Sequence, residues 1–153
     1  MVRRWLVTGT SGFIGFHVTR ALLARGEEVI GIDNLNSYYD PALKGDRIDQ
    51  VIRHNAFIFR RLDSSQPDAI LPLADEWQRI TGIVHLAAQA GVRYSLENPF
   101  AYVQANVMGQ VTILEFARRM KSLRHFVYAS SSSVYGANRK VPFAIEDDVS
   151  APQ

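Results

Sequence analysis

Residues 4–15 read Arg4-Trp-Leu-Val-Thr-Gly-Thr-Ser-Gly-Phe-Ile-Gly15, a short apolar run followed by three spaced glycines. The apolar run predicts a β-strand that ends at Gly9, and the residues after the turn predict a helix. Gly9 allows the tight exit from the strand, Gly12 lets the backbone approach a pyrophosphate, and Gly15 lets the helix pack closely. Glycines at this spacing between a strand and a helix are typical of a dinucleotide-binding turn. The candidate cofactor-binding residues here are Gly9, Thr10, Ser11, Gly12, Phe13, Ile14 and Gly15.

Strands and helices alternate through the rest of the chain. We predict strands at 4–8, 28–32, 56–62, 82–87 and 124–129, and helices at 13–25, about 47–53, 67–79 and 99–120. This alternation predicts an α/β fold of the Rossmann type, with a doubly wound parallel sheet in the order 3-2-1-4-5. Residues 1–153 are expected to form one dinucleotide-binding domain.

Composition excludes several kinds of protein. The 153 residues contain no cysteine, which rules out disulfides, thiolate metal sites and a cysteine nucleophile. The net charge of +2 comes from interspersed charges, so neither nucleic acid nor a membrane surface is an expected partner, and no metal is expected. The chain has no apolar run of the roughly 20 residues that a membrane span needs. Its first apolar stretch stops at Thr8-Gly9, so we expect no signal peptide and a cytoplasmic protein.

An acidic residue ends the second predicted strand. Asp33 lies 18 residues after Gly15, close to the spacing of the carboxylate that accepts hydrogen bonds from the adenosine ribose. Its charge would repel a 2′-phosphate, and no Lys or Arg occurs between it and Lys44. The predicted cofactor is therefore NAD rather than NADP. Asp63, after the third strand, could accept the adenine amino group or cap the next helix, and the adjoining Asn34 and Ser64 are also expected beside the cofactor.

The longest predicted helix runs from Pro99 to Met120, with Asn98 as its N-cap. One of its faces carries Phe100, Val103, Val107, Val111 and Leu114, and another carries Ala105, Met108, Phe116 and Met120. One apolar face is enough for a helix to cover a sheet, so a helix with two apolar faces is expected to have a packing partner on each of them. Burial in a larger single core and a subunit interface both explain the second stripe.

Several motifs together resemble those of extended short-chain dehydrogenases/reductases, and within that group the NAD-dependent nucleotide-sugar epimerases. They are Thr8-Gly-x-x-Gly-Phe-Ile-Gly15, His85-Leu-Ala-Ala-Gln-Ala-Gly91, Asn106 and Ser130-Ser-Ser-Ser-Val-Tyr-Gly136. Two further segments look most like those of UDP-glucuronate 4-epimerases: Asp33-Asn-Leu-Asn-Ser-Tyr-Tyr-Asp-Pro-Ala-Leu-Lys44 and Ala90-Gly-Val-Arg-Tyr-Ser95. The resemblance spans nearly the whole chain.

This resemblance implies a reaction on a UDP-sugar. NAD takes hydride from C4 of the sugar while a tyrosine removes the hydroxyl proton, and the 4-keto sugar then receives the hydride on its other face. Ser131 matches the family's catalytic hydroxyl, and Arg93, Ser131 and Ser132 are expected to bind the substrate. The residues expected near the cofactor are Leu86, Ala87, Ala88, Gln89, Asn106, Ala129 and Ser130. His85 lies inside an apolar strand, so we interpret it as a hydrogen-bonded core residue.

The family's Tyr-x-x-x-Lys pair is absent from this sequence. Tyr128 and Tyr135 are followed four residues later by Ser132 and Arg139 rather than by lysine. The chain therefore resembles the amino-terminal half of an epimerase, truncated before the last strands and the substrate domain, and we expect it to be inactive alone. A 4,6-dehydratase is an alternative, although it would carry Asp-Glu where Ser132-Ser133 stand, and a non-catalytic dinucleotide-binding module is another. We expect a homodimer that forms through the Pro99–Met120 helix.

Overall fold

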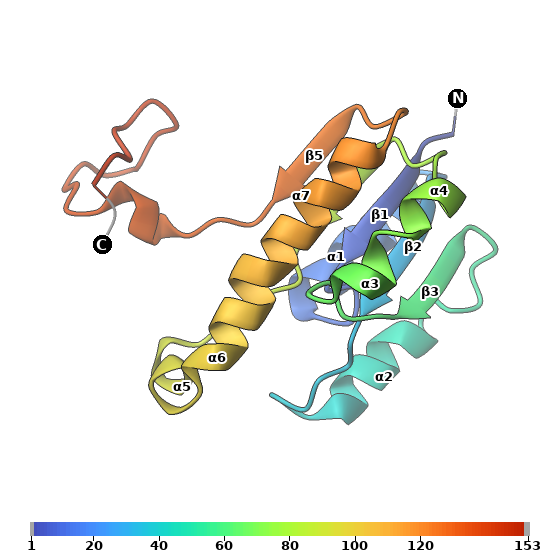
Figure 1. The fold of residues 1–153 in the computed structure, drawn as a ribbon, viewed down its shortest axis with the longest axis horizontal. Helices are drawn as coiled ribbons and strands as arrows, with labels where there is room; N and C mark the ends of the chain where they lie inside the picture. The colour runs from blue at the N-terminus through green and yellow to red at the C-terminus, as the bar shows by residue number, and fades with distance from the viewer. Residues whose placement is uncertain (1, 152–153) are drawn as a thin grey trace.

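The strands form a single parallel sheet, as the sequence predicts. In the computed structural model, which describes residues 2–151, the strand order is β3-β2-β1-β4-β5 (Figure 1). All four pairings are parallel, so the carboxyl ends of the strands share one edge of the sheet. The Rossmann-type fold and its strand order are thus confirmed. The strands are β1 (Arg4–Thr8), β2 (Glu28–Asp33), β3 (Phe57–Arg61), β4 (Gly82–His85) and β5 (His125–Tyr128).

Helices cover both faces of this sheet (Figure 1). One buried cluster joins Trp5, Val7 and Val84 to apolar side chains of α1 and to Ile48 of α2. The other cluster joins Leu6, Ile83 and neighbouring strand residues to α3, α4 and α7. The helical segments are α1 (Phe13–Ala24), α2 (Pro41–Asp49), α3 (Pro67–Ile70), α4 (Leu73–Glu76), α5 (Val92–Glu97), α6 (Pro99–Tyr102), the π-helical η1 (Val103–Met108), α7 (Gly109–Arg119) and the 3₁₀ turn η2 (Ser132–Tyr135).

Two of the predicted helices were placed wrongly. The helix expected at 47–53 instead begins at Pro41, because Asp40 caps it by accepting a hydrogen bond from the Ala42 N–H at 2.9 Å. The segment 67–79 forms two short helices, α3 and α4, with Pro72 between them. Proline has no N–H to donate and disfavours a helical conformation in the residue before it, so a continuous helix does not form there.

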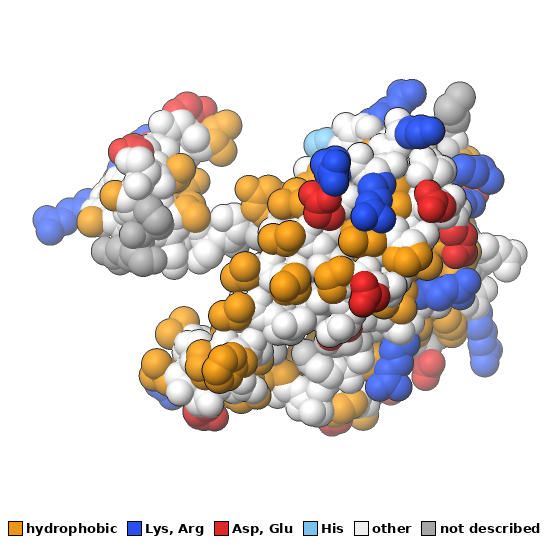
Figure 2. Space-filling view, in the orientation of Figure 1, with side chains coloured by type: hydrophobic (Ala, Val, Ile, Leu, Met, Phe, Trp, Pro, Cys, Tyr) orange, Lys and Arg blue, Asp and Glu red, His pale blue; other side chains and the backbone are white. Residues whose placement is uncertain are grey.

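The predicted long helix extends from Pro99 to Arg119 as α6, η1 and α7. Asn98 caps it as expected, accepting a hydrogen bond from the Ala101 N–H at 3.3 Å. The π-helical turn in the middle was not predicted. This chain covers only part of one of its two apolar faces, since Met108 of that face is 42% exposed. Phe116 and Met120 are buried, whereas Figure 2 shows hydrophobic side chains along the outer face, which consists of Phe100, Val103, Val107, Val111 and Leu114.

Candidate dinucleotide-binding crevice

A cavity of about 160 Å³ lies where β1, β2, β3 and β4 end. Doubly wound folds bind their ligands at this edge of the sheet. The cavity is smaller than a typical small-molecule pocket of about 300–1,000 Å³, so a dinucleotide would extend beyond its enclosed part. Ten predicted cofactor-binding residues line it: Gly9, Gly12, Asp33, Asn34, Asp63, Ser64, Leu86, Ala87, Ala88 and Gln89.

The glycine turn requires glycine for reasons visible in its geometry. Gly9 has φ +69°, and a Cβ there would lie 2.9 Å from the backbone N of Ala87. A Cβ at Gly15 would lie 2.0 Å from the Gly9 carbonyl oxygen, which no local adjustment of a side chain could relieve. At Gly12 the same oxygen would be 3.1 Å away. The first turn of α1 therefore packs directly on the turn that precedes it, and the Gly9 and Gly12 backbones are left to face the cavity.

This turn fits a diphosphate. The first N–H groups of a helix have no partner within the helix, and they carry partial positive charge toward the turn. Ser11 is fully buried, and its hydroxyl has no hydrogen-bond partner in the described part of the chain. Thr10, by contrast, donates its hydroxyl to the Val7 carbonyl at 2.7 Å, which fixes the turn internally. Phe13 and Ile14 contribute helix-start backbone, while their side chains are exposed and lie outside the cavity lining.

Asp33 connects the glycine turn to the loop after β2. Its carboxylate accepts hydrogen bonds from the Ser11 N–H at 3.0 Å and from the Leu35 N–H at 2.8 Å. Leu35 adopts φ +53°, a conformation that is uncommon for leucine and that folds this loop back beside the carboxylate. The side chain of Asp33 lines the cavity, so it can still accept hydrogen bonds from a ligand's ribose hydroxyls.

Asp63 lines the cavity and also stabilises the local structure. It accepts hydrogen bonds from the Asn34 side chain at 3.0 Å and from both the N–H and the hydroxyl of Ser65 at 2.9 and 2.7 Å. Burial alone would raise the pKa of the Asp63 carboxyl, but these hydrogen bonds outweigh it and hold the pKa below its usual value. Gln66 occupies the N-cap position of α3, so Asp63 stabilises the turn before that helix instead of capping it.

Eight residues of the cavity wall were not predicted from the sequence: Ile32, Asn36, Tyr38, Tyr39, Lys44, Leu62, Ala90 and Ala105. Lys44 is only 4% exposed and donates hydrogen bonds to the carbonyl and side-chain oxygens of Asn36 at 2.9 and 2.6 Å. Its ammonium group also lies 4.7 Å from the ring centre of Tyr39. Burial lowers the pKa of Lys44, Asp33 opposes this shift, and Arg47 reinforces it. The signal was the run Asp33–Lys44, which the family resemblance had already singled out.

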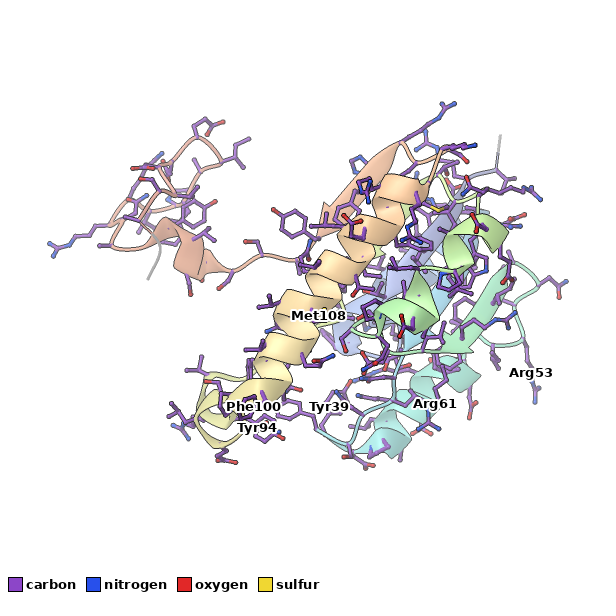
Figure 3. The ribbon with its side chains drawn as sticks, viewed as in Figure 1. Tyr39, Arg53, Arg61, Tyr94, Phe100 and Met108 are labelled. Atoms are coloured by element: carbon purple, nitrogen blue, oxygen red, sulfur yellow. The ribbon has the colours of Figure 1, made fainter. Side chains whose placement is uncertain are left out.

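Tyrosines join this loop to α5 and α6. The rings of Tyr38 and Tyr94 lie 5.0 Å apart, and those of Tyr94 and Tyr102 lie 6.3 Å apart. Figure 3 shows Tyr94 and Phe100 together at the α5–α6 end of the molecule, with Tyr39 between that end and α2. Arg93, expected to bind the substrate, lies on α5 with an exposed side chain and is not part of the cavity lining.

Asn106 holds one wall of the cavity in place. Its side-chain oxygen accepts the Gln89 N–H at 2.7 Å, and its amide donates to the Gln89 carbonyl at 3.0 Å. Asn106 is part of the π-helical η1, and π-bulges occur frequently at functional sites. In the described structure Asn106 therefore positions cavity residue Gln89 and does not itself line the cavity.

His85 is a core residue, as the sequence indicates. It is 4% exposed, and its Nδ1 lies 2.7 Å from the Thr8 hydroxyl. That hydroxyl already accepts hydrogen bonds from the N–H groups of Leu86 and Ala87, so its own proton is donated to Nδ1. Burial lowers the pKa of His85 to about 4, which keeps the ring neutral near pH 7.

The predicted catalytic segment is not assembled with this cavity. Ala129 donates its backbone N–H to the His85 carbonyl at 3.1 Å and so follows β5 directly. Ser130, Ser131 and Ser132 come next, are exposed, and belong to a segment that leads away from the sheet (Figure 1). The Ser131 hydroxyl accepts the Ser133 N–H at 3.2 Å at the start of η2. The predicted roles of Ser130, Ser131 and Ser132 stay predictions.

Within residues 2–151, no helix is long and apolar enough to cross a membrane. The same residues contain no group of three or more His, Asp or Glu side chains placed to hold a metal ion.

Comparisons with curated proteins point to one group. The chain is 47% identical over 150 residues to a probable UDP-glucuronate 4-epimerase of Rhizobium meliloti, covering 97% of this chain and 43% of the relative. It is 46% identical over 147 residues to UDP-glucuronate 4-epimerase 3 of Arabidopsis thaliana, covering 96% and 34%. An uncharacterised protein of Methanocaldococcus jannaschii is 51% identical over 149 residues, 96% of this chain and 45% of that protein. The chain thus spans about half or less of the length of these relatives.

A solved structure agrees with this grouping. A variant of the UDP-glucuronic acid 4-epimerase of Bacillus cereus, in complex with NAD and UDP-4-deoxy-4-fluoro-glucuronic acid, superimposes with a TM-score of 0.83 at 34% identity. The match covers 98% of this chain and 46% of that one. Residues 5–153 match the family model described as the NAD dependent epimerase/dehydratase family. The chain therefore belongs to the NAD-dependent epimerase/dehydratase family.

Proposed function

We propose that this chain is the NAD-binding portion of a UDP-glucuronate 4-epimerase. The glycine turn and the buried Asp33, which meet through the Ser11 N–H, carry this proposal. In this role the start of α1 binds the diphosphate of NAD, and Asp33 accepts hydrogen bonds from its adenosine ribose. The UDP-glucuronate 4-epimerases among the relatives support this substrate class.

The mechanism divides between cofactor and protein. When bound, NAD would supply the chemistry of hydride transfer at C4 of the sugar. Gln89, held by Asn106, forms part of the wall around the bound dinucleotide. Ser131 would hydrogen-bond the reacting C4 oxygen, because a hydroxyl can both donate and accept. The proton-accepting tyrosine and its lysine have no counterpart in this sequence, so we propose that residues 1–153 bind the cofactor without turning over substrate.

Calorimetry with NAD and NADP tests the cofactor assignment. We expect NAD to bind and NADP to bind at least tenfold more weakly, since Asp33 would face the 2′-phosphate. Asp33→Ala should weaken NAD binding about tenfold to a hundredfold, because it removes hydrogen bonds to a charged acceptor. The Asp33→Ala variant should also show a smaller difference between its affinities for NAD and NADP. Asp49→Ala, at the exposed end of α2, is the matched control and should bind NAD normally.

Equal binding of both dinucleotides by the unaltered chain, or no heat of binding with either, would overturn the cofactor assignment.

Incubation with NAD and UDP-glucuronate tests the reaction. We expect NAD to bind and no UDP-galacturonate to form, whereas formation of the epimer would show that this chain carries its own proton acceptor.

We also propose a homodimer through the exposed face of the long helix. Phe100 is 82% exposed, and Val103, Val107, Val111 and Leu114 extend the same apolar face. Soluble monomers rarely expose a large contiguous apolar surface, so such a surface usually marks a site of interaction with another molecule. Light scattering at about 10 µM should give twice the monomer mass, and Val107→Lys should restore the monomer. Val141→Lys makes the same substitution at a residue that is 90% exposed and lies outside this face, so it should leave the dimer intact. A monomeric mass for the unaltered chain would refute the interface.

A further inference from the structure

A second cavity, of about 770 Å³, opens at the amino-terminal edge of the sheet. Five residues of β1, or about 17 Å, separate this edge from the dinucleotide crevice. Its volume falls within the range of small-molecule sites. The lining comes from the start of β1, the residue after α1, and the connection from α7 to β5: Val2, Arg3, Trp5, Arg25, Thr81, Lys121, Ser122, Leu123, Arg124 and His125.

The lining is strongly cationic. Arg3, Arg25, Lys121 and Arg124 belong to it, together with no acidic residue. Arg25 lies 3.9 Å from Glu27. In the described part of the chain, the other three side chains take part in none of the salt bridges or side-chain hydrogen bonds. Figure 2 shows Lys and Arg side chains gathered at this end of the molecule, near the amino terminus and the end of α7. Three like charges without such partners, beside Arg25, raise the local concentration of anions.

An aromatic wall adds a second feature. Trp5 is 9% exposed, and its indole N–H is buried without a hydrogen-bond partner. The indole lies over Gly82, where a Cβ would come within 2.4 Å of the ring, and meets His125 edge-on at 6.4 Å. Val2 and Leu123 complete an apolar surface beside the cations.

We propose that this cavity binds a nucleoside polyphosphate, a site separate from the dinucleotide crevice. Guanidinium groups bind phosphate oxygens with two parallel hydrogen bonds, and three arginines surround the space. A chain of linked phosphates can reach several of these cations at once. The apolar wall of the exposed Val2, the half-buried Leu123 and the edge of Trp5 then covers the base, which a bare phosphate lacks.

Fluorescence titration tests the site directly. The chain has two tryptophans, so Trp77→Phe leaves Trp5 as the only reporter of the cavity. With NAD at saturation, UTP and inorganic tripolyphosphate should both bind saturably below about 1 mM, UTP more tightly. Lys121→Ala combined with Arg124→Ala should weaken both ligands at least about tenfold, because two cation–phosphate contacts are lost. Calorimetry on the unaltered chain should give the same affinities.

Arg118→Ala combined with Arg119→Ala removes two cations from the nearby end of α7, outside the lining, and should change affinity less than about twofold. The proposal fails if no saturable binding occurs, if both double variants weaken binding equally, or if saturating NAD abolishes it. Equal affinity for UTP and tripolyphosphate would refute the role of the apolar wall. Trp5 fluorescence reports on this cavity alone. A failure of NAD to bind in the crevice would therefore be distinguished from a failure of UTP to bind in this cavity.

Discussion

Gly15→Ala should destabilise the chain by about 2–4 kcal/mol and abolish measurable NAD binding. The added Cβ would lie 2.0 Å from the Gly9 carbonyl oxygen and 2.7 Å from its carbon, both of which are backbone atoms. The start of α1 must therefore move away from the turn. Because Gly9 and Gly12 form the floor of the crevice, that movement displaces the N–H groups that would hold the diphosphate. Urea denaturation and calorimetry with NAD measure the two effects.

Gly45→Ala is the matched control for this variant. Gly45 lies inside α2, and a Cβ there would meet nothing within 4 Å. Replacing a helical glycine by alanine in open space should stabilise the chain by about 0.5–1 kcal/mol. NAD affinity should stay unchanged. If Gly15→Ala were as stable as the unaltered chain and bound NAD normally, the close packing of α1 on the turn would not matter for the site.

The sheet could be predicted because its signals are local. Each strand is a short apolar run bounded by residues that favour turns, and the glycine turn identifies which strand is central. The end of α1 was equally clear: Gly26 has φ +74°, and its N–H and that of Glu27 bond to the carbonyls of Leu23 and Leu22. The position of α2 was also encoded, since Asp40-Pro41 is a helix-start signal, but the helix was predicted several residues later, at about 47–53.

The missed part of the site depends on contacts that sequence does not reveal. Lysine is almost never fully buried unless paired, so nothing in the sequence predicts that Lys44 lies under Tyr39 and bonds to Asn36. The positive φ of Leu35 is also unexpected, because residues with a side chain such as leucine rarely adopt it.

Periodicity has a comparable limit in the long helix. It reveals two apolar faces without saying which one the sheet covers. The described structure covers the face that carries Phe116 and leaves the face that carries Val107 exposed. Sequence also does not predict the π-helical turn that contains Asn106, or the hydrogen bond from Gln89, which lies 17 residues away along the chain.

Acid should destabilise this fold through His85. The pKa of the ring is about 4 in the folded chain, against an ordinary value near 6.5. Below pH 6.5 the unfolded chain binds a proton that the folded chain does not, so the free energy of unfolding falls with pH until about pH 4. Between about pH 7 and about pH 4.5 this single group should cost about 2–3 kcal/mol. Urea denaturation at the two pH values measures the loss.

His85→Asn isolates this effect from the protonation of carboxylates. Asparagine keeps an acceptor for the Thr8 hydroxyl but does not titrate, so the variant should lose about 2–3 kcal/mol less on acidification than the unaltered chain. His17→Asn changes an exposed histidine of α1 and should keep the full acid sensitivity. Equal acid losses for His85→Asn and the unaltered chain would mean that the folded chain protonates His85 as readily as the unfolded chain does, contrary to the lowered pKa that burial gives the ring. The Thr8 hydroxyl also receives the Leu86 and Ala87 N–H groups, so protonation of His85 in the folded chain, which occurs near pH 4, should loosen the crevice wall and weaken NAD binding at that pH.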